Sequence, residues 1–351
     1  MIPGFSIVIC TYNGASRLAP TLEHLAALTI PAGNCLEVIL VDNASTDDSG
    51  AVATRCWHTL GEPFPLMVLL ENRPGKGYAI ETGYDAAQHT HILTVDDDNW
   101  LAANYLVVAQ HLLHQHPDVG VLQGRNTAVF ESPPPAWLVG FEYTLVIGSP
   151  VKECGYFARD NFRVWGAGMV IERASWLTLR KLGFAFLTSK VPGKASGEDN
   201  ETAMALMLLG RKVYYSDELY YQHFMPVNRV KWETLVANYE VAAYVNYHFL
   251  LYALVIDAHN KNQSPSEKHL RAIFWSFFLR NANQFTLKQN IAYWVWPRKK
   301  NYQLGLSYYY KMYSVYANNN KIMARDFSAL KNWIFPLLKQ SEEEFHWPLE
   351  I

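Results

Sequence analysis

Three adjacent aspartates, Asp96, Asp97 and Asp98, directly follow the apolar run 92–95. Carboxylates this close together repel one another unless a cation balances their charge. Hard divalent ions such as Mg²⁺ and Mn²⁺ prefer carboxylate oxygens and often complete their coordination with substrate phosphates. The triplet therefore predicts a divalent-cation site that meets a diphosphate, and the alternative is a solvated acidic turn.

A second acidic group, Glu198, Asp199 and Glu201, ends a loop rich in Gly, Ser and Lys and leads into the helical pattern 202–209. Acidic residues in the first turn of a helix are stabilised by the helix dipole, which is an ordinary structural explanation. The functional alternative is that one carboxylate accepts a proton from an incoming hydroxyl while the loop closes over the site and excludes water. The residues alone leave both explanations open.

Short apolar runs alternate with helical patterns through the first third of the chain. The predicted strands are 6–10, 36–41, 66–70 and 91–95, and the predicted helices are 15–28, 49–60 and 77–89. This alternation is typical of an α/β fold with a Rossmann-like, mostly parallel sheet flanked by helices. Ligands bind at the carboxyl ends of such strands, which here carry residues 11–13, 42–43 and 96–98. The same polar residues are also common turn formers and helix caps.

The order of these motifs resembles that of family 2 glycosyltransferases of the GT-A fold. The motifs that carry the resemblance are 6–13, 41–47, 72–77, 95–98, 165–168 and 197–200. The resemblance implies a GT-A catalytic domain at 1–225, with a nucleotide-sugar half at about 1–115 and an acceptor half at about 116–225. It also implies inverting, hexosyltransferase-type transfer from a nucleotide-diphosphate sugar to a hydroxyl of a glycan or lipid-linked acceptor, with Mn²⁺ or Mg²⁺ as cofactor.

The resemblance also assigns roles to the two acidic motifs. Asp96 and Asp98 stand at the outer positions of the family's DxD motif, Asp97 fills the middle, and Asp98 is the expected direct metal ligand. Asp199 matches the catalytic base, which would deprotonate the acceptor hydroxyl as its oxygen attacks the anomeric carbon from the face opposite the nucleotide.

On the donor side, the resemblance places Thr11, Asn13 and Asp42 along the nucleoside pocket and Lys76 near the phosphates. His223, after the predicted strand 212–215, stands where many such enzymes carry a metal-binding histidine, although a lone His is more often structural. The family's Ala-Arg-Asn-x-Gly stretch is not matched, because residues 79–83 lack both the Arg and the Asn. No donor contact is carried over there.

Charge and cysteine content limit the remaining possibilities. The 30 basic and 32 acidic residues give a net charge of −2, which argues against nucleic acid as a partner. The four cysteines form no CxxC pair, and Cys10 and Cys35 lie in apolar strand contexts typical of buried thiols. The first residues lack the basic region and cleavage site of a signal peptide. We therefore expect a reducing, cytoplasmic location.

The composition changes beyond about residue 225, where aromatic residues and helical patterns dominate and a helical region, 226–351, is predicted. Aromatics mixed with cations, as in 270–280 and 294–300, are compatible with peripheral contact with the inner face of an anionic membrane. Packing onto the catalytic domain explains the same aromatics and is favoured. The apolar run 241–256 is shorter than the roughly 20 residues of a spanning helix.

Other functions explain less of the sequence. A nicotinamide dehydrogenase requires G-x-G-x-x-G after the first strand, and residues 11–16 do not match it. A sugar-phosphate nucleotidyltransferase remains the enzymatic alternative, although the Gly-rich, Lys-bearing entry loop expected to hold its triphosphate is absent from that position. A non-catalytic sugar-binding or membrane-docking protein is the other alternative, and it leaves the acidic site at Asp199 without a role.

Overall fold

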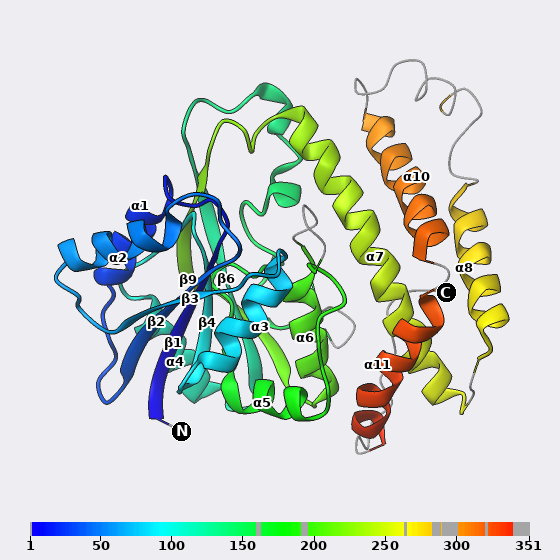
Figure 1. The fold of residues 1–351 in the computed structure, drawn as a ribbon, viewed down its shortest axis with the longest axis horizontal. Coiled ribbons are helices and arrows are strands. Elements are labelled where there is room, and N and C mark those ends of the chain that lie inside the picture. The colour runs from blue at the N-terminus through cyan, green and yellow to red at the C-terminus, as the bar shows by residue number, and fades with distance from the viewer. Residues whose placement is uncertain are drawn as a thin grey trace.

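The computed structural model describes residues 2–158, 163–190, 196–262, 265–282, 289, 301–319 and 322–339. Its centre is a mixed β-sheet with the strand order β3-β2-β1-β4-β8-β6-β9-β5, flanked by helices, and the C-terminal helices lie to one side of it (Figure 1). The predicted fold class, a mostly parallel sheet flanked by helices with a helical C-terminal region, is confirmed.

The first four strands are parallel, and one helix connects each strand to the next. They are β1 (Ile2–Thr11), β2 (Cys35–Asp42), β3 (Leu66–Leu70) and β4 (His89–Asp96), and the helices between them are α1 (Leu18–Ala26), α2 (Ser49–Thr59) and α3 (Lys76–Ala86). Each predicted strand and helix is present, with bounds that shift by up to four residues. Thr11 pairs with Asp42 and Cys10 with Asp96, so the polar strand ends meet at one edge of the sheet.

The second half of the sheet mixes strand directions. Its elements are β5 (Asn99–Leu101), α4 (Tyr105–Gln115), β6 (Val119–Phe130), η1 (Ala136–Leu138), η2 (Glu142–Leu145), β7 (Gly155–Tyr156), β8 (Val170–Glu172), α5 (Arg173–Lys181), α6 (Glu198–Leu208) and β9 (Lys212–Met225). Strand β9 pairs parallel with β6 and antiparallel with β5, which places His223 opposite Asn99. The prediction that His223 follows a strand ending at Tyr215 is wrong, because pairing with β6 resumes at Tyr220 after a register shift and β9 runs on through His223.

The C-terminal region consists of α7 (Trp232–Asn260), α8 (Glu267–Ala282), α10 (Asn301–Asn319) and α11 (Met323–Leu338). Its apolar side chains share one core with the sheet: Trp333 of α11 lies edge-on to Phe184 at 5.2 Å between ring centroids. The favoured prediction, packing onto the catalytic part, holds for these aromatics. The predicted segment 294–300 lies outside the described residues, as do the side chains of 277–280.

Among the described helices, α7 alone has the length and mean hydropathy, 1.4, of a membrane-crossing segment. The core helix of a soluble protein has the same properties, and 78% of this apolar window is buried inside the protein. Length and composition are therefore weak evidence for a membrane span here.

Two cysteines differ from each other in exposure although both begin or end a strand. Cys10 is partly buried near the end of β1, and burial raises the pKa of its thiol. The prediction of a buried thiol is wrong for Cys35, which is exposed because it is the first residue of β2 and precedes the part of the strand that enters the core.

Candidate active site

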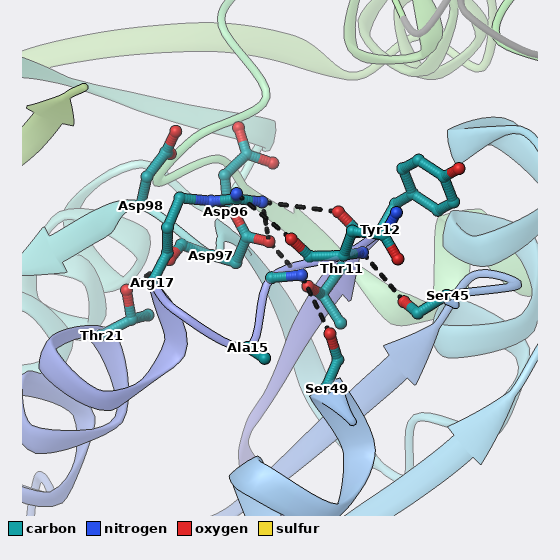
Figure 2. Close-up of polar contacts among 12 residues, drawn as sticks. Thr11, Tyr12, Ala15, Arg17, Thr21, Ser45, Ser49, Asp96, Asp97 and Asp98 are labelled. Carbon is teal, nitrogen blue, oxygen red and sulfur yellow. Dashed lines mark hydrogen bonds and ion pairs between the residues drawn. The ribbon is translucent and has the colours of Figure 1, made fainter. Parts of the chain in front are cut away.

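The middle carboxylate of the triplet, that of Asp97, holds the turn after β4 in place. Arg17 donates to both of its oxygens, from Nε to Oδ1 at 3.1 Å and from Nη2 to Oδ2 at 2.9 Å, and Thr11 Oγ1 donates to Oδ2 at 2.6 Å. Thr21 Oγ1 donates to the Asp97 carbonyl at 2.9 Å (Figure 2). A Cβ on Gly14 would lie 2.4 Å from Asp97 Oδ2, so only glycine fits beside this carboxylate. Burial raises the pKa of Asp97, and the bond from Arg17 opposes that shift.

The third carboxylate, that of Asp98, is buried but faces several donors. Its Oδ2 accepts from Arg229 Nη1 at 2.6 Å, and its Oδ1 accepts from Asn99 Nδ2 at 3.1 Å. Burial alone would raise the pKa of Asp98, but the positive charge of Arg229 holds it well below its usual range. Asp98 is therefore charged at neutral pH and attracts cations.

His223 presents an unused lone pair to Asp98. Its Nδ1 lies 3.1 Å from the carbonyl oxygen of Val146, and because a carbonyl only accepts, Nδ1 carries the proton. Its Nε2 is buried, has no hydrogen-bond partner among the described residues and lies 3.7 Å from Asp98 Oδ1. A buried imidazole lone pair facing a charged carboxylate fits a divalent cation such as Mn²⁺.

The described residues contain no group of three or more His, Cys, Asp or Glu side chains spaced to hold a metal ion. Asp98 and His223 are thus a two-residue donor set. Mg²⁺ and Mn²⁺ commonly take one or two protein ligands and complete their coordination with waters and substrate phosphates. The pair fits that pattern and does not fit a fully protein-enclosed metal site.

The first carboxylate, that of Asp96, is paired with Lys76. The Lys76 ammonium lies 2.7 Å from Asp96 Oδ1 and 3.1 Å from Glu198 Oε1. Burial alone would lower the pKa of Lys76, but these two carboxylates hold it well above its usual value. Lys76, at the start of α3, therefore joins the triplet to the acidic motif of α6.

Asp199 lies at the start of α6, beside the backbone of the turn that precedes β8. Its Oδ2 accepts from the Gly166 amide at 3.0 Å, and its Oδ1 accepts from the amide and the side chain of Asn200, both at 2.7 Å. Gln123 holds that turn by bonding the Trp165 amide at 2.7 Å and the Trp165 carbonyl at 2.6 Å. Burial, followed by repulsion from Glu198, raises the pKa of Asp199 to about 7. A carboxyl with this pKa can accept a proton near neutral pH.

The predicted nucleoside residues lie at the same edge of the sheet. Asn13 adopts a positive φ of 50°, and its Oδ1 accepts from the Thr46 amide at 2.8 Å. The Asp42 carboxylate accepts from the Ser45 amide at 3.1 Å, and Thr11 bonds to Asp97. These contacts match the structural explanation of the polar strand ends, and the nucleoside contacts of the three residues stay predictions.

Sequence reasoning did not single out two cations of this site. Arg17 lies inside the predicted helix 15–28, and Arg229 lies beyond the region of resemblance. Three adjacent carboxylates require positive charge nearby, and this requirement could have pointed to basic side chains. The prediction assigned that charge to a metal ion alone. The structure meets part of that demand with Arg17, Lys76 and Arg229.

Curated relatives are similar over parts of the chain. An undecaprenyl-phosphate 4-deoxy-4-formamido-L-arabinose transferase of Pseudomonas syringae is 32% identical over 93 residues, which cover 26% of this chain and 27% of that protein. The protein of the same name from Pseudomonas aeruginosa is 23% identical over 211 residues, or 58% of this chain and 62% of that protein. The chain thus matches about a quarter of the first relative's length and under two thirds of the second's.

Solved structures show the same fold over nearly the whole chain. A mannosyltransferase from Pyrobaculum calidifontis, in complex with GDP-Man and Mn²⁺, is 18% identical with a TM-score of 0.53, covering 92% of this chain and 88% of that one. S. aureus TarS in complex with UDP is 16% identical with a TM-score of 0.50, covering 96% and 91%. The family model described as glycosyl transferase family 2 matches residues 6–176. The segment 6–176 is therefore similar to glycosyl transferase family 2, and the chain has the GT-A fold.

Proposed function

We propose that this protein is a metal-dependent, inverting glycosyltransferase that moves a sugar from a nucleotide-diphosphate sugar to a hydroxyl of a glycan or lipid-linked acceptor. The observation that carries the proposal is the pair of unlike sites at one edge of the sheet. Asp98 and His223 form a cation-binding pair, and Lys76 joins their turn to the helix that begins with the buried Glu198 and the half-buried Asp199. One site suits the leaving diphosphate and the other suits the attacking hydroxyl.

On the donor side, Asp98 and His223 would hold the divalent cation, and Asp96 would assist from its position beside Lys76. When bound, the cation supplies a Lewis acid that neutralises charge on the departing nucleotide diphosphate. Asp97 stays on Arg17 and keeps the turn rigid. Two structural neighbours support a donor of this class, because one contains GDP-Man with Mn²⁺ and the other, S. aureus TarS, contains UDP.

On the acceptor side, Asp199 accepts the proton of the acceptor hydroxyl. The oxygen forms a bond to the anomeric carbon while the bond from that carbon to the diphosphate oxygen breaks on the opposite face, so one displacement inverts the anomeric centre. The Gly166 amide and Asn200 orient the carboxylate during this step. Once protonated, Asp199 returns its proton to solvent.

The curated relatives bear on the acceptor and on the location of the protein. Relatives named undecaprenyl-phosphate transferases favour a lipid-linked acceptor, and such an acceptor would be met at the cytoplasmic face of a membrane. Peripheral contact through the C-terminal helices is compatible with this location.

The test is a transfer assay with a panel of UDP- and GDP-sugars and mixed glycan and lipid-phosphate acceptors, with added Mn²⁺ and with excess chelator. We expect release of nucleotide diphosphate that depends on both acceptor and metal, and a product of inverted anomeric configuration. Equal turnover in excess chelator would contradict the metal requirement. Tight nucleotide binding with no turnover on any acceptor would favour the non-catalytic alternative.

A further inference from the structure

Arg229 lies between β9 and α7 and reaches back to the triplet. Its Nη1 lies 2.6 Å from Asp98 Oδ2, and its side chain is 38% exposed, whereas that of Asp98 is 5% exposed. Its own amide donates to the Pro226 carbonyl at 2.8 Å, which closes a turn at the base of the side chain. Arg229 therefore extends from a surface turn to a buried carboxylate.

The two arginines at the triplet are held differently. Arg17 binds both oxygens of Asp97 and also donates from Nη1 to the Asn13 carbonyl at 3.3 Å. Arg229 has one acidic partner among the described residues, Asp98, through one nitrogen. Breaking one contact frees the Arg229 guanidinium, whereas freeing Arg17 requires several contacts to break.

Arg229 also occupies one oxygen of the carboxylate that a metal ion would need. Asp98 Oδ2 accepts from Arg229, while Asp98 Oδ1 faces the unused lone pair of His223 Nε2. A guanidinium and a divalent cation repel each other at contact distance from one carboxylate. A cation that binds Asp98 and His223 would therefore loosen Arg229, unless another anion arrives to hold the guanidinium.

We infer that Arg229 is an exchangeable counter-cation: it competes with the divalent cation for Asp98 in the absence of donor, and it moves to the donor diphosphate when cation and nucleotide bind together. The inference rests on the proposed function. A diphosphate bound to the cation lies beside Asp98 and presents the oxygens that a guanidinium prefers. The exchange makes the binding of metal and the binding of nucleotide cooperative. The cation takes the place of Arg229 at Asp98, and the diphosphate gives the released guanidinium a new anionic partner.

The test measures Mn²⁺ binding by the electron paramagnetic resonance signal of free Mn²⁺, with and without UDP or GDP. It compares the wild-type chain with Arg229→Ala, Arg229→Lys and Asp98→Asn. Lys231→Ala is the matched control, because Lys231 is an exposed cation of the same connection that contacts Asn228 rather than the triplet. Nucleotide affinity is measured in the same samples by calorimetry at saturating Mn²⁺.

For Arg229→Ala we expect Mn²⁺ alone to bind roughly tenfold more tightly, and nucleotide to bind roughly tenfold more weakly with Mn²⁺ present, within the range of coupled sites. Arg229→Lys and Lys231→Ala should stay near the wild-type values. Unchanged or weaker Mn²⁺ binding by a folded Arg229→Ala protein would overturn the competition, and unchanged nucleotide affinity would overturn the transfer to the diphosphate.

The two proposals fail in different ways. If Asp98→Asn binds Mn²⁺ as well as the wild-type chain, the proposed metal site is wrong whatever Arg229 does. If Asp98→Asn loses Mn²⁺ binding while Arg229→Ala behaves like the wild-type chain, the metal site stands and the role of Arg229 falls. Circular dichroism and thermal unfolding of each variant establish that the chain is folded.

Discussion

The two acidic clusters of this protein contain the same kinds of residue but are neutralised differently. The carboxylates of Asp96, Asp97 and Asp98 each pair with a side-chain cation from a distant part of the chain. Asp199 instead accepts from the Gly166 amide and Asn200. As a result, the pKa of Asp98 lies well below its usual range although burial acts to raise it, whereas burial raises that of Asp199 to about 7.

This difference shows that the ion-pair and hydrogen-bond partners of a carboxylate, more than its residue type, determine its chemical role. Paired with full positive charge, an aspartate stays ionised and suits a cation. Surrounded by neutral donors and a neighbouring carboxylate, it holds a proton near neutral pH and suits proton transfer. Four changes would break or sharpen this comparison.

The largest expected effect comes from Asp199→Asn. An amide keeps the shape and the bonds to Gly166 but cannot accept the hydroxyl proton, so the transfer rate should fall by roughly 10²- to 10⁴-fold while the donor affinity changes little. Steady-state kinetics with saturating donor measure this. Asp118→Asn is the control, because Asp118 is a surface aspartate paired with Lys212, and it should keep the wild-type rate. A folded Asp199→Asn protein with full activity would remove the proposed base.

Removing the Arg17 side chain, which binds both oxygens of Asp97, should mainly lower the stability of the folded protein. Arg17→Met leaves a buried carboxylate without its cation, and we expect the free energy of unfolding to fall by about 3 kcal/mol. Urea unfolding followed by fluorescence measures the loss. Adding Asp97→Asn should recover part of it, because the stranded charge is then gone. Equal losses in the single and double variants would show that Arg17 stabilises the turn through its bonds to backbone carbonyls instead.

The pH dependence should separate the two clusters. Asp199 acts as a base only when deprotonated, so the rate should rise about tenfold per pH unit below its pKa of about 7 and then level off. Stability should move the other way: a carboxyl whose pKa is raised on folding contributes stability at low pH that is lost as the pH rises through about 7. Paired measurements of rate and thermal unfolding between about pH 5 and pH 8 check both signs. A rate that is flat across this window would contradict the assignment of the base.

The smallest expected effect concerns Glu201, the buried carboxylate that stabilises the same helix. It accepts from the Thr188 amide at 2.8 Å and from the Tyr252 hydroxyl at 2.6 Å. Tyr252→Phe should lower the free energy of unfolding by about 1 kcal/mol, because the other donors remain. Tyr247→Phe is the matched control, since the buried Tyr247 hydroxyl has no hydrogen-bond partner in the described part of the chain and its removal should cost nothing. Equal losses in the two variants would contradict the role of the Glu201 bond.

The parts of this structure that could be predicted from sequence are those set by local pattern. Apolar runs located the first four strands, and the rule that ligands meet the carboxyl ends of parallel strands brought Thr11, Asp42 and Asp96 to one edge. Among the acidic residues of this helix start, Glu201 has a structural role, because it accepts from Thr188 and Tyr252.

The parts that could not be predicted depend on pairs far apart in the chain. Arg229 reaches Asp98 across 131 residues and Arg17 reaches Asp97 across 80, and no local periodicity encodes such pairing. His223 was predicted to follow a short strand of residues 212–215. Pairing with β6 on one side and β5 on the other extends that strand through it.

The Tyr252 hydroxyl connects two parts of the molecule mechanically. Tyr252 belongs to α7, and its partner Glu201 belongs to the helix that begins with Glu198 and carries Asp199. Both helices are continuous through these residues, so a displacement of α7 is transmitted to the helix of Asp199 through one short hydrogen bond. A contact made by the C-terminal helices would therefore be transmitted through α7 and α6 to Asp199, the carboxylate that would meet the acceptor.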